Sequence, residues 1–202
     1  GDNDYVRIPI TTGITSQTQG SIVAWIKTKD DTITDNNNIF SANDGNDATS
    51  IGVFQIGSSR DALLIAIYEA GVASFNLEAR NTIITANRWY HVAAVQDGSG
   101  PKLYIDGIQQ ALTAVAGSAT SSDWFNNINT INDISIGREV RSSTAQGHFN
   151  GTIDEVSVWN RSLSSAEINN LYKRGALSLN LSVRSCDDSS CSGETYNQVL
   201  NN

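Results

Sequence analysis

Paired carboxylates carry out most enzymatic hydrolysis of sugars, and the chain contains several acidic residues that could serve. Retaining hydrolysis needs two carboxyl groups about 5 Å apart. Alternate positions of one strand would supply such a pair, because they share a face of the sheet. No apolar run of this sequence carries that alternation. Asp154 and Glu155 are adjacent, so a regular strand would point them to opposite faces, and Glu69 and Glu78 stand alone. We therefore predict that the chain is not an enzyme.

Histidine-assisted nucleophilic chemistry has no better support in the sequence. Of the two histidines, His91 lies within an apolar run and His148 precedes a bend that contains glycine. The Gly-x-Ser-x-Gly motif, which marks the nucleophile of α/β-hydrolases, does not occur. A strand histidine bonded to a neighbour is the expected role of His91.

The two cysteines, Cys186 and Cys191, lie close together in a polar stretch near the end of the chain. A zinc site needs four ligands, usually thiolates or imidazoles, and the distant histidines do not complete such a set. We expect a local disulfide, with free thiols as the alternative. Because disulfides persist in oxidising compartments, the pair favours a secreted or cell-surface protein.

Charge and hydropathy argue against two classes of partner. Acidic residues number 21 against 13 lysines and arginines, which gives a formal net charge of −8, and the basic residues form no cluster. Nucleic-acid binding depends on basic clusters that neutralise phosphates, so no nucleic-acid partner is expected. No apolar run approaches the roughly 20 residues that cross a bilayer, so no membrane insertion is expected.

Short runs of alternating apolar and polar residues recur along the chain and predict strands with one buried face. Asp106-Gly107 separates two such runs and is typical of a hairpin turn. Ser164 and Glu167 fit a capping box, followed by an apolar stripe that predicts a surface helix near 165–174, with Gly175 as a left-handed cap. The runs span residues 5–8, 21–27, 39–41, 51–56, 63–68, 73–77, 82–84, 89–95, 102–105, 108–112, 134–137, 151–159 and 177–184.

These patterns predict an all-β sandwich in residues 1–175. Residues 176–202 would form a terminal strand and a disulfide hairpin, or the start of a following domain. Trp25, Trp89 and Trp159 lie in alternating runs, where large aromatic side chains usually belong to the core. We expect that placement for all three.

Several longer phrases occur in a fixed order along residues 3–175. Together they resemble the laminin-G-like domain of the concanavalin A-like lectin/glucanase superfamily in its bacterial and archaeal form. The phrases are Asp4-Tyr5-Val6-x-Ile8-Pro9, Val23-Ala24-Trp25-Ile26-Lys27, Trp89-Tyr90-His91-Val92-Ala93, Leu103-Tyr104-Ile105-Asp106-Gly107, Ile134-x-Ile136-Gly137 and Phe149-Asn150-Gly151-x-Ile153-Asp154-Glu155-Val156-x-Val158-Trp159. The resemblance implies a jelly roll of two antiparallel sheets, one of them concave.

The resemblance also implies a function. We expect a non-catalytic recognition module, in a larger secreted or cell-surface protein, that binds a glycan or a cell-surface or matrix protein. Its other partners would be further domains of the same polypeptide. A structural spacer is the alternative, and a glycoside hydrolase or lyase with an unrecognised site is less favoured.

Two sets of site residues follow. Trp124 and Phe125 sit in a polar loop and could stack on a sugar ring, or fold back as a lid on the sandwich edge. The resemblance further implies a structural calcium ion, whose oxygen ligands would include a strand carboxylate and loop groups. The candidate calcium ligands are Asp154, Asp2, Asn43, Asp44 and Gly45.

Overall fold

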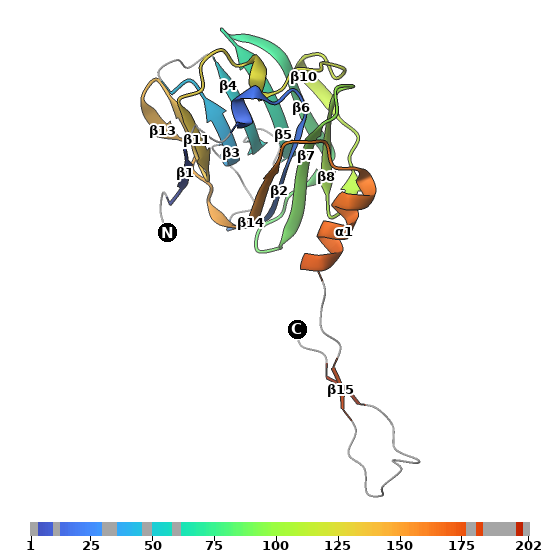
Figure 1. Cartoon of the computed structure of the whole chain (residues 1–202). Helices are drawn as coiled ribbons and strands as arrows, with labels where there is room; N and C mark the ends of the chain where they lie inside the picture. The colour runs from blue at the N-terminus through green and yellow to red at the C-terminus, as the bar shows by residue number, and fades with distance from the viewer. Residues whose placement is uncertain are drawn as a thin grey trace, which may run out of the picture.

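The computed structural model describes residues 4–9, 13–29, 36–45, 50–57, 62–176, 181–183 and 197–199. Two antiparallel sheets stack as the layers of a sandwich (Figure 1), which confirms the predicted jelly roll. The larger sheet has the order β1 (Val6–Ile8), β11 (Asp133–Ile136), β3 (Asn37–Asn43), β4 (Ile51–Gly57), β5 (Ala62–Glu69), β6 (Val72–Ile83) and β10 (Thr113–Gly117). The smaller has the order β14 (Gly151–Trp159), β2 (Gly20–Thr28), β7 (Tyr90–Gln96), β8 (Pro101–Ile105) and β9 (Ile108–Gln109).

Besides the one α-helix, three further pieces of the described chain lie outside the two sheets. The hairpin of β12 (Glu139–Arg141) and β13 (Thr144–Gln146) lies against β3 and β11. The strands β15 (Leu181–Val183) and β16 (Asn197–Val199) pair with each other. Short 3-10 turns span Ile14–Ser16 and Phe125–Asn127. The predicted disulfide falls outside the described residues, because Cys186 and Cys191 both do.

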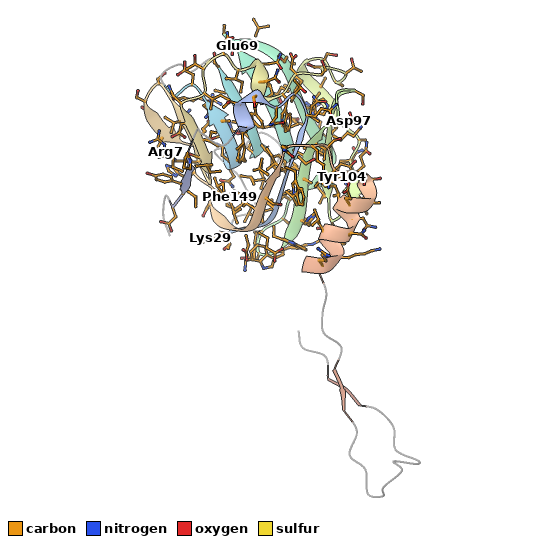
Figure 2. The ribbon with its side chains drawn as sticks, in the orientation of Figure 1. Arg7, Lys29, Glu69, Asp97, Tyr104 and Phe149 are labelled. Carbon is orange, nitrogen blue, oxygen red and sulfur yellow. The ribbon has the colours of Figure 1, made fainter. Side chains whose placement is uncertain are left out.

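The central core fills the space between the two sheets. Phe40, Phe54 and Phe75 of the larger sheet meet Ile22 and Ile26 of the smaller one, and all five side chains are fully buried. They occupy every second position of their strands, because the pleat sends alternate side chains to opposite faces. Figure 2 shows the side chains that line both layers, with Phe149 at the core and Tyr104 on the helix side of the smaller sheet.

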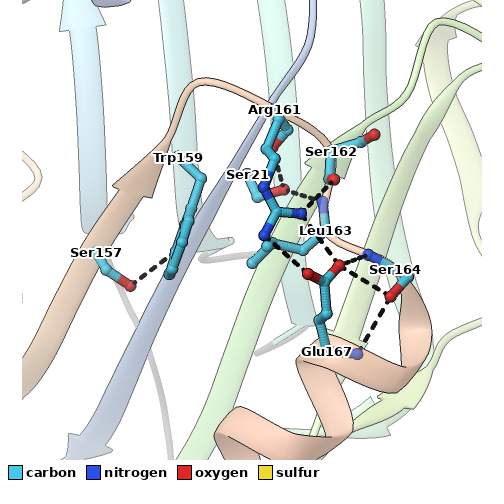
Figure 3. Close-up of polar contacts among 8 residues, drawn as sticks. All are labelled: Ser21, Ser157, Trp159, Arg161, Ser162, Leu163, Ser164 and Glu167. Carbon is cyan, nitrogen blue, oxygen red and sulfur yellow. Dashed lines mark hydrogen bonds and ion pairs between the residues drawn. The ribbon is translucent and has the colours of Figure 1, made fainter.

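The single α-helix of the described chain, α1 (Ser165–Gly175), begins at the predicted capping box. The Ser164 hydroxyl accepts the Glu167 N–H at 3.3 Å, and the Glu167 carboxylate accepts the Ser164 N–H at 2.8 Å. The buried Ser21 hydroxyl donates to the Arg161 carbonyl and accepts the Leu163 N–H (Figure 3), so it anchors the segment that leads into the helix to β2. These bonds fix where the helix starts on the outer face of the smaller sheet.

Helix α1 ends differently from the prediction. The C-cap is Ala176, in the right-handed region, and Gly175 is the last helical residue rather than a left-handed cap. A Cβ atom on Gly175 would lie 2.6 Å from Cε2 of the Trp25 indole. Glycine is therefore needed because the helix end lies directly against a tryptophan of β2, and the backbone there has an ordinary helical conformation.

Three rings form a layer between β2, β7 and α1. The Trp25 ring meets the His91 ring edge-on at 5.4 Å between centroids, and Tyr172 packs 5.9 Å from Trp25. His91 is 1% exposed on its strand, as expected, but its Nδ1 has no hydrogen-bond partner within the described chain, so the expected bond to a neighbour is not made by that atom. Burial lowers the pKa of His91 from 6.5 to about 4, although the charge of Asp106 partly opposes the shift.

The three tryptophans predicted for the core lie outside it. Trp25 and Trp159 are partly exposed on the outer side of the smaller sheet, and Trp89 is 37% exposed. The same strands bury Ile22, Ile26 and other aliphatic side chains inwards. These runs do alternate between the two faces, as predicted. Their tryptophans, however, lie on the outer face, where α1 covers part of the sheet.

We predict that Gly175→Ala destabilises the domain. Alanine favours a helix over glycine by about 1 kcal/mol, but the clash with Trp25 should outweigh this and cost about 1–3 kcal/mol in free energy of unfolding. Chemical denaturation measures the change, with the exposed helix residue Asn170→Ala as the control, which should stabilise slightly. A rise in stability of Gly175→Ala would contradict the close approach described here.

We also predict that His91 makes stability fall with acid. Its pKa is lower in the folded chain, so the unfolded chain takes up the proton first as the pH drops. The stability that the neutral ring contributes is complete above about pH 6.5 and is lost between about pH 6.5 and 4, by about 1.4 kcal/mol per pH unit. Denaturation of wild type and His91→Phe across this range should show a shallower slope for the variant; equal slopes would refute the assignment.

Candidate functional site

A pocket of about 330 Å³ opens on the face of the larger sheet that points away from the core. It is called the sheet pocket below. Its floor comes from alternate residues of β4, β5 and β6, which stand side by side across the sheet: Val53 is paired with Ala66, and Ala66 with Asn76. The lining residues are Asn36, Ile51, Val53, Gln55, Leu64, Ala66, Tyr68, Gly71, Asn76 and Arg141.

Three buried polar atoms around the sheet pocket have no hydrogen-bond partner within the described chain: Gln55 Oε1, Asn76 Oδ1 and Arg141 Nε. Gln55 is only 5% exposed. The Asn76 amide is oriented by its bond to the Tyr68 hydroxyl, at 2.9 Å. Because a buried polar group without a partner is costly, two acceptors and one donor at one pocket make it a candidate site for a polar ligand.

Arginines offset the carboxylates on this face of the sheet. Glu139, which is 2% exposed, bonds the Arg141 guanidinium at 3.1 Å, and Glu78 bonds Arg80 at 2.7 Å. Burial raises the pKa of Glu139, and Arg141 partly reverses that rise. Both carboxylates are thus held in ion pairs and form no free pair of the kind that glycoside hydrolysis uses.

A second pocket, of about 520 Å³, opens on the outer face of the smaller sheet beside α1. It is called the helix pocket below, and its lining residues are Trp25, Arg88, Trp89, Asp106, Asp154, Glu155, Tyr172, Gly175 and Ala176. The prediction that Asp154 and Glu155 face opposite ways is wrong. Strand β14 bulges between Asp154 and Ser157, with Glu155 at φ 49°, so both acidic residues line the same pocket.

Trp124 and Phe125 do not form a surface platform for a sugar. They are 2% and 1% exposed, and Phe125 meets Phe40 of the core edge-on at 5.6 Å. Both rings are packed in the central core cluster, so in this structure neither offers an exposed face on which a sugar could stack. The polar loop around them gave no sign of this, because the sequence does not show that Gly20 and Gly52 leave room for the two rings.

The candidate calcium ligands lie in separate places. Asp154 is exposed on β14, where its Oδ1 accepts the Glu155 N–H at 2.7 Å. Asn43 ends β3 in the other sheet, and Asp44 and Gly45 follow it. Asn132 accepts the Gly45 N–H and donates to the Asp44 carboxylate. Asp2 falls outside the described residues. Within the described ranges, no three His, Cys, Asp or Glu side chains are grouped to hold a metal ion.

Sequence reasoning missed the residues of the sheet pocket. Gln55 and Asn76 did carry a signal, since each interrupts an apolar run at an outward-facing position. Nothing local shows that this outer face is itself buried. Arg141 belongs to the short β12–β13 hairpin, which no run of alternation predicted.

Comparison with known proteins gives a consistent family and fold. A laminin-G-like family model, described as the concanavalin A-like lectin/glucanases superfamily, matches residues 1–169. No curated protein sequence matches the chain. Within the described residues, no helix is long and apolar enough to span a bilayer.

Two similar solved structures are carbohydrate-related domains. The CBM40 of the Ruminococcus gnavus IT-sialidase, solved with α2,3-sialyllactose, has a TM-score of 0.68 at 17% identity, over 85% of this chain and 100% of that one. Domain 4 of AbnA, a GH43 arabinanase from Geobacillus stearothermophilus solved with arabinotriose, has a TM-score of 0.58 at 19% identity, over 83% and 72%. At these identities the likeness establishes the fold.

The calcium ion implied by the family resemblance stays a prediction. It predicts a higher melting temperature in millimolar calcium than in excess EGTA, by about 2–4 °C for each kcal/mol that bound calcium adds to the free energy of unfolding. Asp154→Asn keeps the acceptor for Glu155 N–H but removes the charge, so it should abolish the difference. Asp123→Asn, at a carboxylate outside the set of candidate ligands, is the control, and its calcium response should match wild type. Equal melting temperatures of wild type in calcium and EGTA would contradict calcium binding.

Proposed function

The chain belongs to the concanavalin A-like lectin/glucanase superfamily, and from this premise we propose that it is a non-catalytic module that binds a glycan in the sheet pocket. The observation that carries the proposal is the set of unpartnered polar atoms there. Sugar hydroxyls both donate and accept hydrogen bonds. They can therefore satisfy the two amide acceptors, on Gln55 and Asn76, and the Arg141 donor together.

The apolar part of the pocket suits a sugar as well. Val53, Leu64 and Ala66 form a small cluster with Tyr68, separate from the central core. Binding sites for small molecules combine such an apolar floor with a few well-placed polar groups. A pocket of about 330 Å³ has room for one or two sugar units rather than a long chain.

Charge balance around the pocket favours neutral hydroxyl groups as the recognised chemistry. The Arg141 guanidinium already bonds Glu139, which offsets its positive charge. Arg141 therefore offers the ligand a directed hydrogen-bond donor more than a net positive charge. The similar structures were solved with an acidic and a neutral saccharide respectively, which supports glycan binding in general. A module of this kind would serve a secreted or cell-surface protein, alongside other domains of the same polypeptide.

The test is a glycan array with wild type and Gln55→Leu, followed by titration of the best ligand. Leucine fills a similar volume without the orphan acceptor, so affinity should fall at least tenfold, or about 1.4 kcal/mol. The free energy of unfolding should be unchanged or higher. Gln19→Ala, at an exposed amide in the bend before β2, is the control and should bind as wild type does.

Two outcomes would contradict the proposal. If wild type binds no glycan on a broad array, the alternative that the domain is a structural spacer would be favoured. Undiminished binding by Gln55→Leu and by Asn76→Ala would show that any glycan binds elsewhere on the domain.

A further inference from the structure

The helix pocket is larger than the sheet pocket and takes no part in the function proposed above. Its walls are three aromatic rings, Trp25 and Trp89 from the smaller sheet and Tyr172 from α1. Trp89 is 37% exposed and lines the pocket, so part of its ring is available to a ligand. Gly175 lets α1 end against Trp25, so the rigid sandwich and the helix together shape the cavity.

Two of the three carboxylates that line the helix pocket form no ion pair within the described chain. Asp106 bonds Arg88 at 2.8 Å, and this pair is locally neutral. Asp154 and Glu155 make no ion pair within the described chain, and both are exposed. The β14 bulge brings them to one pocket, and the Asp154 carboxylate accepts the Glu155 N–H at 2.7 Å. The pocket therefore joins aromatic surface to two carboxylates that form no ion pair within the described chain, and the Lys27 ammonium lies nearby over the Trp89 ring.

The aromatic wall already takes part in one cation contact. The Lys27 ammonium lies 5.1 Å from the centroid of the Trp89 ring. A tryptophan ring attracts cations through its quadrupole, and a neighbouring carboxylate strengthens the preference. The apolar face of a sugar ring packs on an indole in the same way that other flat apolar groups do. A ligand that has both a ring face and a cation would use the whole lining.

We propose that the helix pocket binds a saccharide that carries a primary ammonium group, as in an amino sugar without its acetyl group. The ring stacks on the Trp89 indole, and the ammonium donates charge-assisted hydrogen bonds to Asp154 and Glu155. A neutral sugar loses the charge pairing, and an acidic sugar is repelled. The two outer faces of the sandwich thus recognise different saccharides through different residues.

The test uses tryptophan fluorescence, since Trp25 and Trp89 line the pocket. The probes are a glucosamine trisaccharide, the N-acetylglucosamine trisaccharide and n-butylammonium, in low-salt buffer with EGTA so that calcium does not occupy the carboxylates. The glucosamine trisaccharide should bind at least tenfold more tightly than either of the other two. Its affinity should fall as salt rises, because the charge interaction is screened.

Variants locate the site. Asp154→Asn and Glu155→Gln should each weaken glucosamine trisaccharide binding several-fold, and the double variant at least tenfold, with unchanged melting temperature. Asp123→Asn, a carboxylate on a distant loop, is the control and should bind as wild type does. Gln55→Leu should also bind as wild type does, which separates this site from the sheet pocket.

Three results would overturn the proposal. Equal affinity for the acetylated trisaccharide would remove the role of the ammonium group. Equal affinity for n-butylammonium would show an organic-cation site with no preference for a sugar. Unchanged binding in the Asp154→Asn/Glu155→Gln double variant would place the ligand elsewhere.

Discussion

The strand pleat is the constraint on which both pockets depend. Gln55 lies between Phe54 and Ile56, two fully buried core residues, so its side chain must point to the opposite face of β4. The same constraint turns Asn76 outwards between Phe75 and Leu77 on β6. Each core strand therefore presents a second, outer row of side chains, and the function proposed here belongs to that row.

A different element packs beside the outer face of each sheet. On the larger sheet, the β12–β13 hairpin supplies Arg141 and the buried Glu139 to the edge of a pocket whose floor is sheet. On the smaller sheet, α1 packs Ile168 against the face and leaves its C-terminal turn beside Trp25. The core fixes both faces rigidly, while hairpin and helix decide what each can bind. This division would let one fold carry the two separate sets of binding groups proposed above.

The sequence predicted most of the architecture because period-two alternation and the capping box are local signals. It predicted the helix start at Ser164, the hairpin at Asp106-Gly107 and the family. The sequence did not predict features that depend on contact between two segments far apart in the chain. The need for Gly175 depends on Trp25, about 150 residues away in sequence, and the burial of Phe125 depends on the space at Gly52. The β14 bulge defeated the alternation rule at Asp154 and Glu155, since one extra residue turns both to one pocket.

The central claim is that the sheet pocket binds a glycan through groups that lack partners in the free protein. The most direct measurement is a ¹H–¹⁵N NMR titration of the side-chain amides with a glycan that binds. We expect the chemical shifts of the Gln55 and Asn76 side-chain amides to change and saturate together. Those of the Trp25 and Trp89 indole N–H groups should not change. Shifts confined to the indole resonances, with the two amides unmoved, would contradict it.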